Sequence, residues 1–452
     1  MQIAIHADQT QANPLAWGLL HGLTRSQLSA VNPTPLIRAV QPKSWRMSNH
    51  SNDVYGYVVN DAKFLAMDGT QIVWNVQDSF MMAQGGSSST RICIGAVGCP
   101  TADALKFASF AELRAAWNTF LSNFLMAAPA LDWYDIFAEP DLRVFGLTMP
   151  NDLVTLYLDA ETAIRGRYAQ ARLVAPSYGA FTDGFDNRLV EFVQALKLRG
   201  GTPNAIAWHE FGAHPGAVIE HAAAARAVAC TPACPELHIN EYESGLYTLW
   251  PGRAVAWLHY FQAAGIHQAN RACWDVQVEG GPKTSTCWST FNGLLDDTYQ
   301  ATQPLYWVHE RYARMSQGGR WLVTEPFADV DLPNKRLEGV AAVAADMGNE
   351  VRLLVGNFGA SEVAPLDIVV TGYPHLADGM ATVTSERIAG IGSTISRTAR
   401  IPEAAVTSKV SVAGRGLVIR LPTLKAGDAH AIVIGSENSQ QVVSEESRGG
   451  AI

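Results

Sequence analysis

Eight short apolar segments, separated by amphipathic helical stretches, constrain the fold of this chain more than any other feature. They read AWGLL (16–20), LIRAV (36–40), QIVWNV (71–76), WYDIF (133–137), RLVAP (172–176), AIAWH (205–209), LHIN (237–240) and ANRACW (269–274). Short apolar runs of this kind are typical of strands buried on both faces of a parallel sheet. Because eight parallel strands close a barrel, the alternation predicts an α/β protein with a (β/α)₈ TIM barrel.

The stretches between these segments carry the signals of helix ends. Ser109 and Glu112 form a capping-box pattern before an amphipathic run. Pro251 opens another helical stretch, which stops at Gly265. The sequence has no G-x-G-x-x-G after the first segment and no P-loop, which disfavours a nucleotide-binding sheet.

After residue 316 the pattern changes from strand and helix to strand alone. Residues 318–436 contain alternating segments such as EVRLLVGNF and KVSVAGRGLVIRL between Gly, Pro and Asp turns, which is typical of an antiparallel β-sandwich. A chain of 452 residues also exceeds the usual size of one hydrophobic core. We therefore expect a barrel over 14–316, a C-terminal antiparallel β-sandwich domain over 317–436 and a polar tail over 437–452. Residues 1–13 could add an edge strand to the sandwich.

Two of the eight segments lead into a glutamate. Glu139 follows the fourth in the sequence AEPD, and Glu241 follows the seventh, directly after Asn240. Side chains at the carboxyl ends of barrel strands surround the active site, so both are expected at one rim. A carboxylic acid and a carboxylate about 5 to 5.5 Å apart can cleave a glycosidic bond with retention. Two other interpretations stay open: Glu139 could be a first-turn helix acid, and Glu243 competes with Glu241.

The order of the motifs WYDIFAEPD, AIAWHEFG, LHINEYE and RACW resembles that of the retaining glycoside hydrolases of clan A. With a sandwich after the barrel and VAPSY in the fifth segment, the chain looks most like family 39, and families 79 and 30 are near alternatives. The resemblance implies that Glu139 is the general acid/base and Glu241 the nucleophile. It also implies that Arg46 hydrogen-bonds the nucleophile, that His209 lines the sugar site and that Trp274 forms the platform under the sugar.

The chain departs from the pattern of this clan at two positions. Ala138 stands where an Asn usually precedes the acid/base, and Phe211 where a Tyr often follows the sixth-strand histidine. Both changes leave the carboxylate pair in place but alter the expected contacts with the sugar. They keep open a second function, a catalytically impaired barrel that binds carbohydrate without hydrolysing it. A barrel lyase or isomerase is a further alternative.

Other polar residues lie near the predicted rim. Gln77 and Asp78 follow the third segment and are expected at the rim, where Gln77, like Asn240, would contact the substrate. Glu210, beside His209, would either contact a sugar hydroxyl or neutralise a neighbouring cation. The stretch HEFGAH is unlike a metalloprotease helix, because its histidines are five residues apart and follow a strand. We expect no metal ion and no organic cofactor, since two carboxylates and water suffice for glycoside hydrolysis.

Composition narrows the partners and the compartment. The net charge is −9 and the 33 Lys and Arg residues are dispersed, which disfavours nucleic acid. No apolar run approaches the roughly 18 residues of a membrane-spanning helix, and the first residues lack the pattern of a signal peptide. Local pairing of the six cysteines favours disulfides in an exported protein over buried free thiols; the pairs are Cys93 with Cys99, Cys230 with Cys234, and Cys273 with Cys287.

The sequence thus predicts a secreted or periplasmic retaining glycoside hydrolase that acts on an oligosaccharide, a polysaccharide or a glycoside. It does not specify the sugar, the linkage or the oligomeric state.

Overall fold

A computed structural model describes residues 1–11, 16–21, 33–48, 69–87, 89–95, 99, 104–127, 130–179, 181, 188–212, 214–230, 233–331, 336–373 and 379–436. Eight parallel strands close into a barrel, as the sequence predicts. In order around the barrel they are β2 (Trp17–Leu20), β3 (Ser44–Met47), β4 (Gln71–Asn75), β7 (Trp133–Asp135), β9 (Arg172–Tyr178), β10 (Ala205–Glu210), β11 (Glu236–Tyr242) and β12 (Gln268–Arg271).

The predicted second strand is wrong. Residues 36–40 lie in a helix, α2 (Thr34–Val40), which starts with a proline in its first turn. Ile37 and Val40 are buried and Arg38 is exposed, which is the spacing of one helical face. The second strand is β3 instead, which pairs with β2 on one side and β4 on the other. Its four residues contain Ser44 and Arg46, so it does not form an apolar run.

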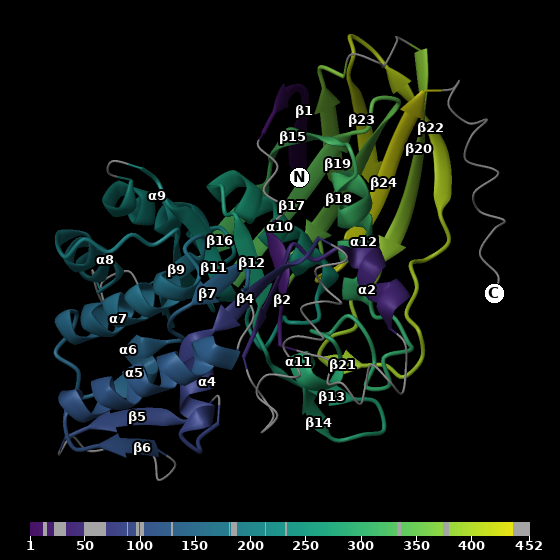
Figure 1. Ribbon diagram of the computed structural model, residues 1–452. Helices are drawn as coiled ribbons and strands as arrows, with labels where there is room; N and C mark the ends of the chain where they lie inside the picture. The colour runs from purple at the N-terminus through teal and green to yellow at the C-terminus, as the bar shows by residue number, and fades with distance from the viewer. Residues whose placement is uncertain are drawn as a thin grey trace.

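Helices cover the outside of the barrel. Figure 1 shows α5, α7, α8 and α9 on the side that faces away from the β-rich part. Half of the capping box is present, because the Glu112 amide donates to Ser109 Oγ (3.3 Å), whereas Glu112 Oε2 accepts from the amide of Ala108, one residue before the cap (2.6 Å). The helices are α4 (Val76–Ala83), α5 (Phe110–Ala127), α6 (Pro140–Arg143), α7 (Asn151–Arg167), α8 (Arg188–Leu198), α9 (Ala217–Ala229), α10 (Pro251–Ala264), α11 (Thr286–Ser289) and α12 (Pro304–Ser316).

The C-terminal part is a ten-stranded sheet, antiparallel except where β1 pairs with β19. Ile3 and Ile368 from one end of the sheet pack in the same cluster as Leu353 and Ile432 from the other, so the sheet folds over into two layers. The predicted barrel with a C-terminal β-sandwich is therefore confirmed. The main strand order is β22 (Val406–Val412), β20 (Gly379–Ile388), β24 (Ala429–Ser436), β18 (Glu350–Asn357), β17 (Arg336–Asp346), β15 (Arg320–Glu325), β1 (Gln2–Thr10), β19 (Leu366–Thr371) and β23 (Leu417–Leu421), and β16 (Phe327–Asp331) pairs with β17.

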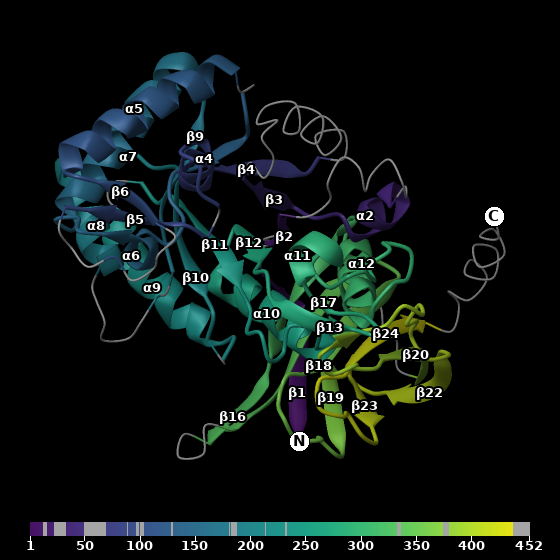
Figure 2. The same ribbon diagram turned by 90° about the horizontal axis from the view of Figure 1, so that it is seen from below.

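The N-terminal strand β1 occupies an interior position in this sheet, between β15 and β19, rather than the edge position that we expected. In Figure 1 and Figure 2 it is the purple strand among the green ones. Two small sheets complete the fold. One contains β5 (Arg91–Ile94), β6 (Ala104–Phe107) and β8 (Val144–Phe145); the other contains β13 (Asp275–Val278), β14 (Lys283–Ser285) and β21 (Thr394–Ile395).

Helix α10 joins the barrel to the sandwich. Gly252 lies so close to the sandwich that a Cβ there would meet the carbonyl oxygens of Asn357 and Asp428 at 2.2 and 2.4 Å. Only glycine permits this approach, and one continuous apolar core runs from the barrel helices to Val343 and Leu354 of the sheet. Because the two parts share a core, the residue limits of the two domains stay a prediction. The predicted tail, 437–452, lies outside the described residues.

The inside of the barrel holds a small apolar cluster of its own. Trp133 lies there with Val73, Val174, Ala205 and Ala207. One large ring opposite small alanines fills the narrow interior, as close packing requires. The next inward positions toward the carboxyl ends of the strands are polar, so this cluster forms the floor of the site described next.

Candidate active site

Glu139 sits at the junction between strand β7 and helix α6, in a backbone conformation that non-glycine residues rarely adopt (φ 50°, ψ 49°). Its amide donates to the Ser177 carbonyl at 2.9 Å, and its own carbonyl accepts from the amides of Leu142 and Arg143. Pro140 begins the helix. These contacts hold the strained residue in place, and strained residues tend to occur at functional sites.

Glu241 reaches the mouth of the barrel because strand β11 is irregular just before it. In the pairing with β10, Trp208 lies opposite Ile239 but His209 lies opposite Glu241, so one residue is inserted at Asn240. Strict alternation would point Glu241 outward, on the same face as Ile239. An inserted residue of this kind changes the direction of the following side chain.

The two glutamates face each other at one rim. One carboxylate oxygen of each, and one ring nitrogen of His209, all lie within 4.8 Å of one another. His209 Nδ1 is 3.3 Å from Glu139 Oε1. The side chains of Glu139 and Glu241 are 24% and 20% exposed, so a ligand can reach both. Their spacing is that of two carboxyl groups on either side of a single anomeric carbon.

The same three side chains offer the oxygen and nitrogen atoms that a divalent cation binds. However, the Arg46 guanidinium donates to Glu241 Oε1 at 2.9 Å, and a cation at this position would be repelled by it. Glycoside hydrolysis by two carboxylates needs no metal.

A buried polar network supports Glu241 from below. Arg46 donates to Asp135 Oδ2 at 2.7 Å as well as to Glu241, and Ser177 Oγ donates to Asp135 Oδ1 at 2.5 Å. Asn240 in turn donates to Ser177 Oγ at 2.8 Å. The predicted contact between Arg46 and Glu241 is therefore present. Asp135 and Ser177 were not predicted; a lone aspartate within the apolar run WYDIF was the signal for the first.

The two carboxyl groups titrate as an interacting pair. Burial raises the pKa of Glu241, and the charges of His209 and Arg46 offset only part of this effect. At Glu139 burial acts in the same direction, but the hydrogen bond and charge of His209, with the charges of Arg143 and Arg46, outweigh it and lower the pKa. Because the two carboxyl groups lie so close, a proton on one of them changes the pKa of the other.

Gln77 and Asp78 support the acid rather than reach the rim. Gln77 Nε2 donates to the Ala138 carbonyl at 2.7 Å and its Oε1 accepts from the Ala138 amide at 3.4 Å, and the side chain is buried. Asp78 accepts from Arg143 Nη1 at 2.9 Å, at the end of helix α6. The structure thus places the buried side-chain amide of Gln77 behind Glu139, where it bonds to the backbone of Ala138. Its contact with substrate stays a prediction.

Glu210 and Glu243 both point away from the pair. Glu210 Oε1 accepts from Trp208 Nε1 (2.6 Å) and lies 2.7 Å from His221 Nδ1 on α9, so its carboxyl group is directed away from the predicted sugar site. Glu243 is fully buried and accepts from Arg253 Nε at 2.5 Å. Of the two residues, Glu241 therefore lies at the rim beside Glu139, and Glu243 does not.

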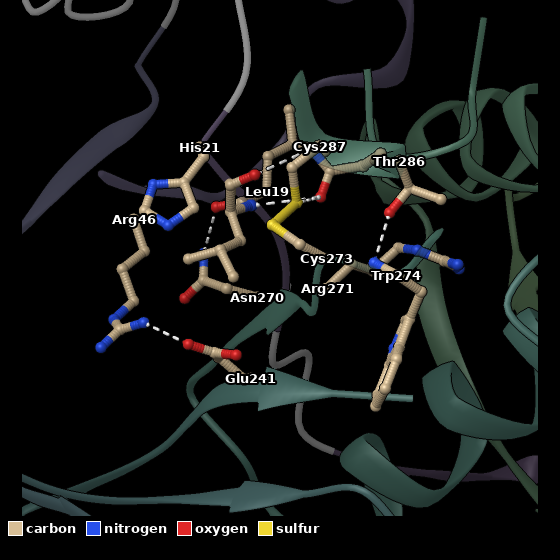
Figure 3. The surroundings of a disulfide bond; sticks show 12 residues. Leu19, His21, Arg46, Glu241, Asn270, Arg271, Cys273, Trp274, Thr286 and Cys287 are labelled. Carbon is tan, nitrogen blue, oxygen red and sulfur yellow. Dashed lines mark hydrogen bonds and ion pairs between the residues drawn. A yellow bond between two sulfur atoms is a disulfide. The ribbon is translucent and has the colours of Figure 1, made fainter. Parts of the chain in front are cut away.

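Trp274 lies on the wall of the mouth, partly exposed. Its ring meets the edge of Phe211 (centroids 5.7 Å apart), and Phe211 in turn meets His209 (5.3 Å). The Trp274 amide donates to Thr286 Oγ1 at 2.9 Å. Figure 3 shows this bond beside the Cys273–Cys287 disulfide, which ties the segment after β12 to helix α11, and it shows Arg46 directed at Glu241.

All six cysteines are paired as predicted, in the disulfides Cys93–Cys99, Cys230–Cys234 and Cys273–Cys287. Such bonds form in oxidising compartments. Within the described residues, no helix has the length and apolarity needed to span a membrane.

The sequence matches no protein-family model and no curated protein. Among solved structures it is similar to N2152 from Neocallimastix frontalis (TM-score 0.68, 14% identity, 96% of this chain and 99% of that one). It is also similar to a glucosidase from Croceicoccus marinus (0.62, 13%, 96% and 98%) and to a GH39 enzyme from Xanthomonas axonopodis pv. citri (0.60, 12%, 96% and 97%).

This chain shares its fold, a (β/α)₈ barrel followed by a β-sandwich, with these solved structures. Glycoside hydrolases of families 30, 44 and 51 share it too. At these identities the likeness establishes the fold and not the family, so the assignment to family 39 stays a prediction. The roles of the site residues likewise rest on the geometry given above.

Proposed function

We propose that this protein is a retaining glycoside hydrolase, nearest to family 39, in which Glu139 is the general acid/base and Glu241 the nucleophile. The observation that carries the proposal is the approach of one oxygen of each carboxyl group to within 4.8 Å at the carboxyl ends of the barrel strands. The shared fold with glycoside hydrolases supports it. The substrate is a carbohydrate, and the three disulfides fit a secreted or periplasmic protein.

The reaction takes two displacements. In the first, the Glu241 carboxylate attacks the anomeric carbon, the glycosidic bond breaks, and the leaving oxygen takes the proton of Glu139. In the second, Glu139 removes a proton from water, whose oxygen attacks the same carbon and releases the sugar from Glu241. Arg46 holds the nucleophile in place, and His209 holds the acid. Trp274 is the proposed platform under the sugar, because an aromatic face packs on a sugar ring.

A covalent label tests the proposal. The protein is incubated with a panel of fluorinated aryl glycosides (xyloside, glucoside, galactoside, arabinoside, glucuronide), digested and examined by mass spectrometry. We expect a sugar adduct on the peptide that contains Glu241. Glu241→Gln should abolish it. Glu210→Gln is the matched control, since Glu210 lies on the neighbouring strand but faces His221, and it should keep the adduct.

A second measurement identifies the acid. Glu139→Ala should lose activity on the aryl glycoside that labels Glu241, and azide should restore part of it by attacking the glycosyl enzyme in place of water. If no glycoside of the panel forms an adduct while sugars still bind, the protein binds carbohydrate without hydrolysing it. This is the alternative function that Ala138, in place of the usual Asn, suggests. Turnover without uptake of solvent oxygen would instead indicate a lyase or isomerase.

A further inference from the structure

The surface next to Glu139 is apolar. Leu142 follows Glu139 on the short helix α6, and its side chain is 47% exposed. It packs on Gly179, where an added Cβ would meet Leu142 Cδ1 at 2.4 Å and Glu139 Cγ at 3.3 Å. Glycine at this position therefore lets the leucine lie directly beside the carboxyl group that protonates the leaving oxygen.

The same apolar surface continues on the other side of the acid. His209 contacts Glu139, Phe211 meets His209, and Trp274 meets Phe211. A Cβ on Gly245 would lie 3.0 Å from the Trp274 ring, so this loop packs against the indole. The next residue, Leu246, is 75% exposed. Leu142 beside Glu139, Phe211 beside His209 and Leu246 next to Gly245 are here called the apolar arc; Trp274, which lies between Phe211 and Gly245, is the proposed sugar platform.

The polar side chains next to Leu142 are already engaged. Asp141 Oδ1 accepts from the Gly179 amide at 2.9 Å, and Arg143 donates to Asp78. A leaving sugar needs hydrogen-bond partners for its hydroxyl groups, because unpaired polar groups lose their hydration on binding. An apolar alcohol needs only contact with carbon atoms, and each buried methylene contributes to binding. An exposed leucine beside the acid, and a second one in the loop that packs against Trp274, suit the second kind of leaving group.

We infer that the substrate is a glycoside of an apolar alcohol, with an aryl or alkyl aglycone packed on the apolar arc, rather than a sugar chain. The inference rests on the proposed function, because it takes Glu139 as the group that protonates the aglycone oxygen. It adds that selectivity comes from carbon contacts on the aglycone side.

Alkyl glycosides isolate this effect, because methyl, butyl and hexyl alcohols leave with nearly equal basicity. All three alkyl glycosides carry the same sugar, which is the one whose aryl glycoside reacts in the panel. For methylenes about half buried on the arc, kcat/KM should rise roughly twofold per methylene and roughly 30-fold from methyl to hexyl. The disaccharide of the same sugar should react more slowly than the hexyl glycoside. A flat series, or faster turnover of the disaccharide, overturns the inference.

Three variants locate the contact. Leu142→Asn and Leu246→Asn should each lower the hexyl-to-methyl ratio of kcat/KM severalfold. Leu198→Asn is the matched control: Leu198 is 88% exposed and ends α8, at the opposite end of the barrel, so the ratio should stay at the wild-type value. Equal ratios in all three variants would place the alkyl group elsewhere and overturn the inference.

Binding separates this inference from the proposed function. If the wild-type protein hydrolyses no glycoside, the inference is tested by binding instead. Calorimetry then measures the affinity of the protein for the methyl and the hexyl glycosides of the five sugars. Tighter binding of a hexyl glycoside that is lost in Leu142→Asn and Leu246→Asn supports the apolar arc even though the hydrolase proposal fails. Equal binding of both glycosides, or no binding, overturns the inference too.

Discussion

Replacing Arg46 with methionine should destabilise the protein strongly. Arg46 is 1% exposed and joins Asp135 (2.7 Å), which is fully buried, to Glu241 (2.9 Å). Among the described residues, Asp135 would then keep the hydrogen bond from Ser177, and its buried charge would lose its ion-pair partner. Removing one partner of a buried ion pair costs about 3 to 5 kcal/mol. We expect Arg46→Met to lower the free energy of unfolding by this amount in urea titrations followed by tryptophan fluorescence.

The control is an ion pair of the same type at the surface. Arg114 makes two hydrogen bonds to Asp159 (2.6 and 2.8 Å) but is 46% exposed, so Arg114→Met should cost about 0.2 to 1 kcal/mol. Adding Asp135→Asn to Arg46→Met removes the unpaired charge and should recover much of the loss. Equal costs for the two arginine variants, or no recovery in the double variant, would refute this reasoning.

Three other outcomes follow from the site and its surroundings. Because the reaction needs Glu241 ionised and Glu139 protonated, the pair must hold one proton, so the kcat/KM profile should be bell-shaped and fall when the pair binds a second proton at low pH or loses its last proton at high pH. Burial lowers the pKa of His259 to about 4, so the unfolded chain binds its proton more readily. Stability should therefore fall by about 3 kcal/mol as the pH drops from 6.5 to 4, a loss that urea titrations should not find in His259→Gln. Serine in place of both Cys273 and Cys287 should raise KM severalfold by freeing Trp274, whereas the same change at the Cys230–Cys234 disulfide should leave the KM for the aryl glycoside unaltered.

Most of the fold could be predicted because its signals are local. Apolar runs identified seven of the eight barrel strands, and caps such as Ser109 and Pro251 located helix ends. The second strand was missed because its buried residues include Ser44 and Arg46, which point into a polar barrel mouth rather than an apolar core. The position of β1 depends on pairing with strands more than 300 residues away, for which the sequence carries no local signal.

Site residues that directly follow an apolar strand could be predicted from the sequence. Site residues whose positions depend on packing between distant strands could not. Glu139 and Glu241 were found from their places after apolar runs. Glu210 could have been assigned correctly, since neighbouring residues on a strand face opposite sides and His209 was already expected to face inward. The inserted residue at Asn240 and the bonds from Gln77 to the backbone before Glu139 depend on tertiary contacts between strands.

The shared proton connects the free site to the proposed chemistry. Glycoside cleavage needs one proton on Glu139 and a negative charge on Glu241. Two carboxyl groups this close do not ionise independently, so one proton belongs to the pair and a modest change in surroundings moves it. A bound glycoside makes such a change. Its glycosidic oxygen can accept a hydrogen bond from Glu139 only when that group is protonated, and the positive charge that develops at the anomeric carbon favours an ionised Glu241. The substrate therefore selects the protonation state in which it reacts.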